Sequence, residues 1–234
     1  GLSSEGFNVF TTTFAPFQTM RCLEQIKVNL GYMKHKVTMV GLASGLILGP
    51  LGYTHCCIED ISIMRSIPNV QVLSPADPFE TAKSVIAAAN SADSTYIRLT
   101  GGSNAPKVYN EDYEFQIGEP VQILEGENIT IFATGTSVYN SLKACEILKE
   151  DKIHPNLINI HTLKPNDTEK IKNYINNSKL IFTIEEHIGI GGLNSMVSEI
   201  NSQMEIGKKH IPIFIPNNYN LSGNYNFLMQ TFKL

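Results

Sequence analysis

Residues 49–55, which read GPLGYTH, place a histidine at the end of a loop rich in glycine and proline. A loop frees an imidazole from core packing, and its glycines let the backbone approach a ligand closely. Imidazole is also the side chain best suited to moving protons near neutral pH. His55 is therefore a candidate catalytic residue, although an ordinary surface histidine that caps the next helix would look the same. Glu59 and Asp60 fall in the first turn of that helix, where their simplest role is to offset the helix dipole.

Three other residues could contribute to a site. His187 follows a predicted strand over 179–186, and open α/β sheets place their sites at the carboxyl ends of strands. We treat His187 as a second candidate catalytic residue, with an ordinary loop histidine as the equal alternative. Phe14 and Phe17, three residues apart at a predicted strand-to-helix junction, point to the same side of that junction. They form either a binding surface or part of the core.

Several common cofactor motifs are absent from the sequence. The stretch GIGGLNS at 189–195 lacks the third glycine of a dinucleotide-binding loop, because Asn194 stands in its place. No P-loop, HExxH or paired-cysteine spacing is present, so the sequence predicts no protein-ligated zinc. Gly135, in the turn TGTS, fits either a phosphate-binding nest or a plain tight turn.

Length and composition predict a globular protein. The 234 residues are enough for one large domain or two ordinary ones. The net charge is −4 and the sequence lacks the clustered lysine and arginine that phosphate backbones require, so we expect no nucleic-acid partner. No apolar run is long enough to span a bilayer, so we expect no membrane partner. Four cysteines without CxxC spacing favour a reduced, cytoplasmic setting.

The hydrophobic pattern predicts an α/β fold of two domains, each a mostly parallel sheet flanked by helices. A polar stretch rich in glycine and proline separates two series of strands and helices. We predict a first domain over 1–108, a connection over 109–124 and a second domain over 125–234. The expected strands cover 36–41, 70–77, 94–100, 128–135, 155–160, 179–186 and 211–216. The expected helices cover 17–30, 58–67, 78–89, 138–148, 165–175 and 193–204.

Two long stretches resemble one enzyme family. TTFAPFQTMRCLEQI (12–26) and GPLGYTHCCIEDISIMRSIPNVQVLSPAD (49–77) closely resemble the pyrimidine-binding domain of transketolases and 1-deoxyxylulose-5-phosphate synthases. The second half resembles the transketolase C-terminal domain through the ordered motifs FATGTS, LKPND and IEEHIGIGGLNS. The resemblance covers essentially the whole chain.

The resemblance implies a function and a site. The cofactor would be thiamine diphosphate with Mg²⁺, bound at an interface between subunits. Phe14 and Phe17 would pack on the aminopyrimidine ring, with Met20 one turn further on. His55 would contact the substrate oxygens that gain and lose protons. The reaction would be transfer of a two-carbon ketol or aldehyde unit between small sugar-like molecules.

The same resemblance implies partners. The metal and the diphosphate would be held by a separate N-terminal-section subunit that carries the pyrophosphate domain. The chain itself would form a dimer flanked by two such partners, a heterotetramer. In the family, the glutamate that protonates the pyrimidine lies upstream of GLSSEGF, outside this sequence. We therefore expect a small subunit, or a fragment of one, that is incomplete as a catalyst. The alternatives are the β subunit of a 2-oxo-acid dehydrogenase or decarboxylase, and a non-catalytic structural subunit.

Some positions depart from the pattern of the family. Leu51 stands where transketolases carry an acidic residue that binds a donor hydroxyl, and Tyr53 replaces a proline. Ala43 falls where they carry a further active-site histidine. No arginine is available near Gly101 for a sugar phosphate, since Arg98 matches a structural position on its strand. These losses favour a donor that is less phosphorylated or more apolar than an ordinary pentose or hexose phosphate.

Overall fold

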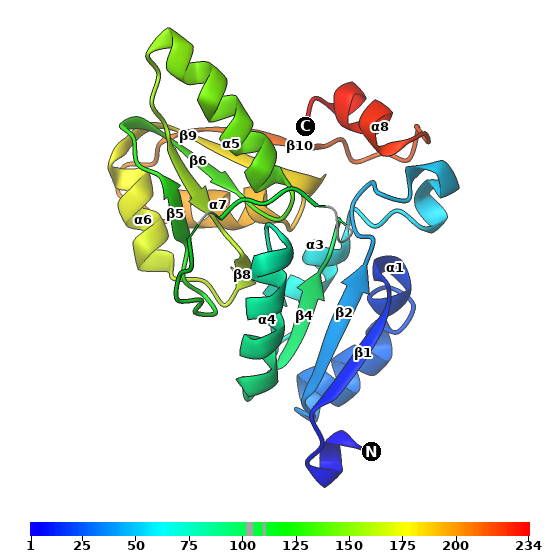
Figure 1. The fold of residues 1–234 in the computed structure, drawn as a ribbon. Coiled ribbons are helices and arrows are strands. Elements are labelled where there is room, and N and C mark those ends of the chain that lie inside the picture. The colour runs from blue at the N-terminus through cyan, green and yellow to red at the C-terminus, as the bar shows by residue number, and fades with distance from the viewer. Residues whose placement is uncertain (102–104, 110) are drawn as a thin grey trace.

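The computed structural model describes residues 1–101, 105–109 and 111–234 and contains two α/β units. Each unit is built on a mostly parallel sheet of five strands flanked by helices (Figure 1), which confirms the predicted fold class. Residues 102–104 and 110, in and next to the predicted connection, lie outside the described residues. In the described part of the chain, no helix is long and apolar enough to cross a membrane.

The elements follow the predicted order, with several additions. The strands are β1 (Val9–Phe14), β2 (Val37–Leu42), β3 (Val70–Leu73), β4 (Ser94–Arg98), β5 (Val121–Leu124), β6 (Asn128–Ala133), β7 (Asn156–Asn159), β8 (Thr162–Lys164), β9 (Ser178–Ile188) and β10 (Lys209–Ile215). The α-helices are α1 (Ala15–Gln18), α2 (Leu23–Gln25), α3 (Asp60–Arg65), α4 (Pro78–Asn90), α5 (Ser137–Leu148), α6 (Thr168–Asn176), α7 (Leu193–Ser202) and α8 (Tyr225–Phe232). Short 3₁₀ helices form at η1 (Ser3–Glu5), η3 (Gly49–Thr54) and η4 (Lys149–Asp151), and η2 (Ile26–Tyr32) is a π-helix.

The first sheet has the order β1-β2-β4-β3-β8. Its first four strands are parallel, so their carboxyl ends meet at one edge of the sheet. Phe14 ends β1 at this edge, and Leu42 ends β2 beside it. The loop that leads to His55 therefore starts next to the phenylalanine pair.

The second sheet has the order β10-β9-β6-β7-β5, with β5 antiparallel to β7. Between β7 and α6 the chain crosses to the first sheet and adds β8 antiparallel to β3. Lys164 fastens this strand, because its ammonium group donates to the carbonyl of Arg65 at 2.9 Å. The strand β8, the formation of β5 inside the expected connection and the C-terminal helix α8 were not predicted. The division into domains 1–108 and 125–234 stays a prediction.

The main core lies between the two units. Along β3 and β4, Val72 and Tyr96 face one side of the sheet and Leu73 and Ile97 face the other, as the two-residue period of a strand requires. Val72 and Tyr96 join a large apolar cluster that contains residues from both sheets. The cluster is completed by side chains from α3, α6 and α7, among them Met64, Ile171 and Leu193.

The helix predicted over 17–30 is interrupted. The structure forms α1, a turn, α2 and then the π-helix η2. At the break, Cys22 has non-helical angles (φ −111°, ψ 22°) and its thiol donates to the carbonyl of Phe17 at 3.1 Å. Side chains that bond the local backbone in this way compete with helical hydrogen bonds. The apolar stripe correctly predicted helical structure here, but the prediction of one unbroken helix was wrong.

The start of the connection is bound to α4 through Glu80. The Glu80 carboxylate accepts hydrogen bonds from Tyr109 at 2.9 Å, Tyr113 at 2.5 Å and the amide of Asn159 at 2.9 Å. Burial raises the pKa of Glu80, and the hydrogen bonds oppose that rise. This network joins the first unit, the connection and β7.

Candidate functional site

Three aromatic rings meet where β1 ends and the loop after β2 returns. The ring centroids are 6.0 Å apart for Phe14 and Phe17, 6.1 Å for Phe14 and His55, and 5.4 Å for Phe17 and His55. Each pair is edge-to-face, the arrangement that aromatic quadrupoles favour. Phe14 remains 38% exposed, so the cluster is open to a planar ligand and is not closed into the core. The structure thus brings together three residues that the sequence singled out.

The loop directs the imidazole toward this cluster. Gly52 adopts φ +70°, and the amide of His55 donates to the Gly52 carbonyl at 3.0 Å. The Nδ1 atom of His55 lies 2.9 Å from the hydroxyl of Thr54. These contacts orient the ring while leaving it only partly buried, as a proton-transfer group requires.

The other residues singled out around the loop lie as follows. Met20 lies in the turn between α1 and α2 with 40% of its surface exposed, and its predicted contact with a cofactor stays a prediction. Leu51 is 56% exposed. Tyr53 packs on Tyr219, with the ring centroids 4.9 Å apart. Ala43 has a left-handed φ of +52° directly after β2.

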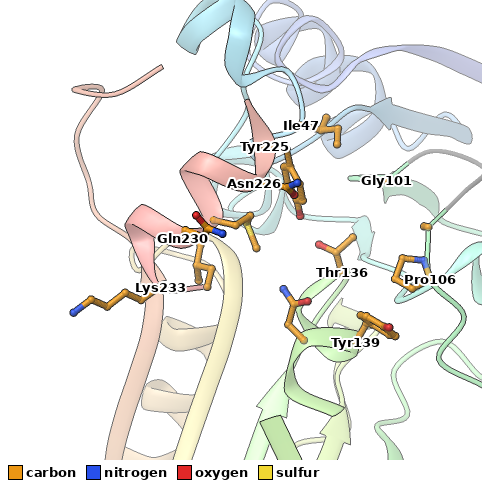
Figure 2. Close-up of a pocket in the computed structure, with 13 residues that line it drawn as sticks. Ile47, Gly101, Pro106, Thr136, Tyr139, Tyr225, Asn226, Gln230 and Lys233 are labelled. Atoms are coloured by element: carbon orange, nitrogen blue, oxygen red, sulfur yellow. The ribbon is translucent and has the colours of Figure 1, made fainter. Parts of the chain in front are cut away.

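A cavity of about 630 Å³ lies between α5 and α8. Figure 2 shows Thr136 and Tyr139 on one side of it and Tyr225 and Gln230 on the other. Two of these residues, Thr136 and Tyr225, also donate hydrogen bonds to the buried carboxylate of Glu186. The cavity therefore adjoins a polar network that reaches the first unit.

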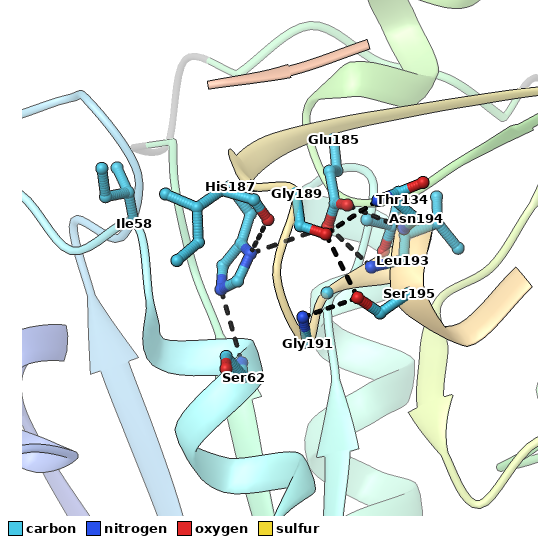
Figure 3. Close-up of polar contacts among 12 residues, drawn as sticks. Ile58, Ser62, Thr134, Glu185, His187, Gly189, Gly191, Leu193, Asn194 and Ser195 are labelled. Carbon is cyan, nitrogen blue, oxygen red and sulfur yellow. Dashed lines mark hydrogen bonds and ion pairs between the residues drawn. The ribbon is translucent and has the colours of Figure 1, made fainter. Parts of the chain in front are cut away.

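His187 is fully buried between α3 and the turn before α7 (Figure 3). Its Nδ1 lies 2.7 Å from the Ile188 carbonyl and its Nε2 lies 3.4 Å from the backbone nitrogen of Ser62. These contacts require Nδ1 to donate and Nε2 to accept. Burial lowers the pKa of His187 to about 4, so the ring is neutral at neutral pH. Its contacts are separate from those of the aromatic cluster, and its predicted catalytic role stays a prediction.

Glu185 explains one glycine of the turn GIGG, Gly192. Its carboxylate accepts from the backbone amides of Leu193 at 2.7 Å and Asn194 at 2.8 Å, at the N-terminus of α7 (Figure 3). A Cβ at Gly192 would lie 2.1 Å from Glu185 Oε2 and 2.7 Å from His187 Nδ1. The glycine thus gives these buried side chains room.

The stability of the protein is expected to depend on the ionisation of Glu185. Burial raises the pKa of its carboxyl from 4.5 to about 7. Between these two pH values the folded state holds a proton that the unfolded state has lost. The resulting stabilisation of the folded state, about 3 kcal/mol, is complete below pH 4.5 and is lost as the pH rises through 7. Urea unfolding of Glu185→Gln at pH 5 and pH 8 should show a smaller difference than the native protein, whereas exposed Glu205→Gln should match it. Equal pH dependence in Glu185→Gln and the native protein would contradict this assignment.

Two buried groups were not recognised from the sequence as parts of a network. Asp60 lies in the first turn of α3 as expected, but it also pairs with Arg98 at 2.9 Å and accepts from the Tyr96 hydroxyl at 2.7 Å. Glu186 accepts from the backbone amide of Leu46 at 2.7 Å. The available signal was two adjacent acidic residues, Glu185 and Glu186, at the end of a buried strand. The structural position expected for Arg98 is confirmed.

The site fits one part of the implied cofactor. The open aromatic rings suit a planar pyrimidine. Among residues 1–101, 105–109 and 111–234, no group of three or more histidine, cysteine, aspartate or glutamate side chains is arranged to hold a metal ion. The open rings are thus compatible with the planar ring of thiamine diphosphate, and the place of its metal stays a prediction.

Comparison with known families divides the chain in two. Residues 1–105 match the pyrimidine-binding domain of transketolase. Residues 118–230 match the transketolase C-terminal domain.

Several relatives of known description are subunits of transketolases. The chain is 34% identical to one subunit of the apulose-4-phosphate transketolase of Phocaeicola vulgatus, over 91% of this chain and 68% of that protein. It is 36% identical to the protein of the same description from Actinobacillus succinogenes, over 86% of this chain and 64% of that protein. A solved split-gene transketolase, described as an inactive β4 tetramer, superimposes with a TM-score of 0.88 at 32% identity and covers 99% of this chain and 73% of that one. The chain thus spans about two thirds to three quarters of the length of these relatives.

The fold and the two domain matches together define a transketolase-type chain. The protein belongs to the transketolase family, a family of thiamine-diphosphate-dependent transferases. Within that family it is a transketolase-like subunit, similar to the corresponding subunits of split enzymes.

Proposed function

We propose that this subunit provides the pyrimidine-binding half of an active site that transfers a two-carbon ketol or aldehyde unit. The observation that carries the proposal is the open cluster of Phe14, Phe17 and His55 at the carboxyl edge of the first sheet. The two phenylalanines would hold the aminopyrimidine and keep water away from it. When bound, thiamine diphosphate supplies a centre that stabilises the charge left as a carbon–carbon bond next to a carbonyl breaks.

In this proposal, His55 moves a proton to or from a substrate oxygen. Its position beside Phe17 and its contact with Thr54 support this role, because the imidazole would lie next to a pyrimidine packed on the phenylalanines. Met20 would contact the edge of the cofactor. His187 is buried between α3 and the turn before α7, so a direct catalytic role would require substrate or protons to reach it there. His187 is the second residue to test.

The partners proposed are a separate N-terminal-section subunit and a second copy of this chain, in a heterotetramer. The partner subunit would hold Mg²⁺ and the diphosphate. The assembly described for the similar split-gene protein, an inactive β4 tetramer, supports self-association and a need for a partner. The four cysteines are free, which supports a reducing compartment such as the cytoplasm.

We propose a small sugar-like donor that is less phosphorylated or more apolar than xylulose 5-phosphate. The support is the exposed Leu51 in the place of an acidic residue and the packing of Tyr53 on Tyr219. Turnover of xylulose 5-phosphate at ordinary transketolase efficiency would overturn this part. Apulose 4-phosphate, in the description of two relatives, belongs in the same substrate panel.

The phenylalanine pair gives a direct test of cofactor binding. Phe17→Ala removes a ring that contacts both Phe14 and His55, and it is expected to weaken thiamine diphosphate binding in the complex about five- to tenfold. Phe79→Ala, a change at a more exposed phenylalanine on α4 outside the cluster, is the control. Isothermal titration with the assembled complex measures both. Equal affinities for the two variants would remove the ring pair from the binding surface.

The function itself is tested by reconstitution. The full-length chain is combined with the pyrophosphate-domain subunit from the same source, thiamine diphosphate and Mg²⁺, and ketol transfer is measured over a panel of donors. We expect transfer only when both subunits and the cofactor are present. Cofactor binding without transfer from any donor would favour the non-catalytic subunit, and decarboxylation of 2-oxo acids would favour the dehydrogenase alternative.

A further inference from the structure

The loop that carries His55 is fastened to the second unit at both of its ends. Leu46 and Ile58 pack in an apolar cluster with Ile188, Ile215 and Leu228, all from the C-terminal half. The amide of Ile188 donates to the carbonyl of Ile58 at 3.0 Å. In Figure 1 the loop and its short helix lie beside α8.

Glu186 is the polar centre of this attachment. Its carboxylate is fully buried and accepts from the Leu46 amide at 2.7 Å, the Thr136 hydroxyl at 2.9 Å and the Tyr225 hydroxyl at 2.7 Å. These three donors belong to the His55 loop, the start of α5 and the start of α8. Gly45 makes the approach possible, because a Cβ there would lie 2.2 Å from Glu186 Oε1.

The backbone of Glu186 extends the attachment to the first sheet. Its carbonyl accepts from Arg98 Nη2 at 2.8 Å, and Arg98 is paired with Asp60 at the start of α3. The loop closes on itself through two hydrogen bonds between Gly45 and Cys57, at 2.7 and 3.1 Å. Glu186, a residue of the second unit, therefore binds both the start of the His55 loop and Arg98 at the end of β4.

We propose that Glu186 is a positioning residue for His55, so that the C-terminal half of the chain sets the place of the proposed proton-transfer group. The inference rests on the proposed function for its catalytic meaning, but the positioning itself is independent of turnover. Glu186 acts through the loop and does not touch the imidazole. Glu80, which is also fully buried but accepts from four donors on a different network, serves as the control for a general loss of stability.

The test compares Glu186→Gln with Glu80→Gln in the full chain. Glutamine keeps one acceptor but cannot accept from all three donors. Amide hydrogen exchange at Leu46, Gly49 and residues 51–55 should rise about tenfold in Glu186→Gln and remain native in Glu80→Gln. The ring signals of His55, identified among six histidines with a His55→Gln variant, should shift only in Glu186→Gln. Native exchange and native His55 signals in Glu186→Gln, or equal changes in the two variants, would overturn the proposal.

Two more conservative variants provide the same test if Glu186→Gln fails to fold. Tyr225→Phe and Thr136→Val each remove one donor and leave the carboxylate in place, and each should cause a smaller change in the same direction. Native behaviour of both would overturn the proposal.

A kinetic arm separates this inference from the proposed function. In the reconstituted enzyme, Glu186→Gln should lower kcat, but the double variant with His55→Gln should lose no more than His55→Gln alone, because both changes act on one group. Additive losses would overturn the positioning role. Absence of turnover in the native complex would count against the proposed function only, since the exchange and spectroscopic results stand without it.

Discussion

Replacement of Asp60 by asparagine is expected to lower the free energy of unfolding by about 3–5 kcal/mol, because it leaves a buried guanidinium without its counter-charge. Arg98 and Asp60 are both essentially inaccessible, and the pair is 2.9 Å apart. Burial alone would lower the pKa of Arg98, but the nearby Asp60 and Glu186 carboxylates raise it above its ordinary value. Urea unfolding monitored by circular dichroism measures the loss.

The surface pair of Lys143 and Glu146 provides the control. It has the same 2.9 Å separation but about half of each side chain is exposed, so Glu146→Gln should leave stability unchanged. The double variant Asp60→Asn with Arg98→Met should recover part of the loss, since it removes the stranded charge. A similar stability for Asp60→Asn and Glu146→Gln would show that the buried pair is not a determinant of the fold.

Substitution of His55 by glutamine is expected to reduce kcat of the reconstituted enzyme by about 10²- to 10⁴-fold, the usual contribution of a positioned proton-transfer group. Glutamine keeps a polar side chain beside Phe14 and Phe17, so thiamine diphosphate affinity should change far less than kcat. Steady-state kinetics and cofactor titration on the same preparation distinguish the two effects.

His154→Gln, at an exposed histidine before β7, is the matched control and should retain native kcat. A fully active His55→Gln enzyme would remove His55 from the chemistry. The prediction for His187 would then be tested next, with His187→Asn, and a loss of kcat at native stability would support it.

Local sequence signals predicted the parts of the site that depend on neighbouring residues. The spacing of Phe14 and Phe17 and the glycine-rich approach to His55 can be read within a few positions, and the three rings do meet. The large elements also follow from their apolar periodicity. The strand β8 could not be predicted in this way, because three residues are too few to show a period.

The long-range contacts that hold the site in place leave no pattern among neighbouring residues of the sequence. Asp60 pairs with a residue 38 positions away, and Glu186 binds the amide of a residue 140 positions away. A single sequence shows each of these acidic residues only as a polar position near an element end. The position of Asp60 in the first turn of α3 was therefore predicted correctly, but its pairing with Arg98 was missed, and Glu186 was not singled out.

The pairing of β8, a strand of the C-terminal half, with β3 of the first sheet limits how such a chain can evolve. The strand β3 is completed by residues of the other half, so a gene break between the halves would leave β3 with an unpaired edge open to aggregation. Recombination that brought in a foreign C-terminal half would also have to bring a β8 that fits β3, together with a Lys164 that reaches the carbonyl of Arg65. The two halves are thus expected to be inherited as one unit, with fission tolerated elsewhere along the ancestral gene.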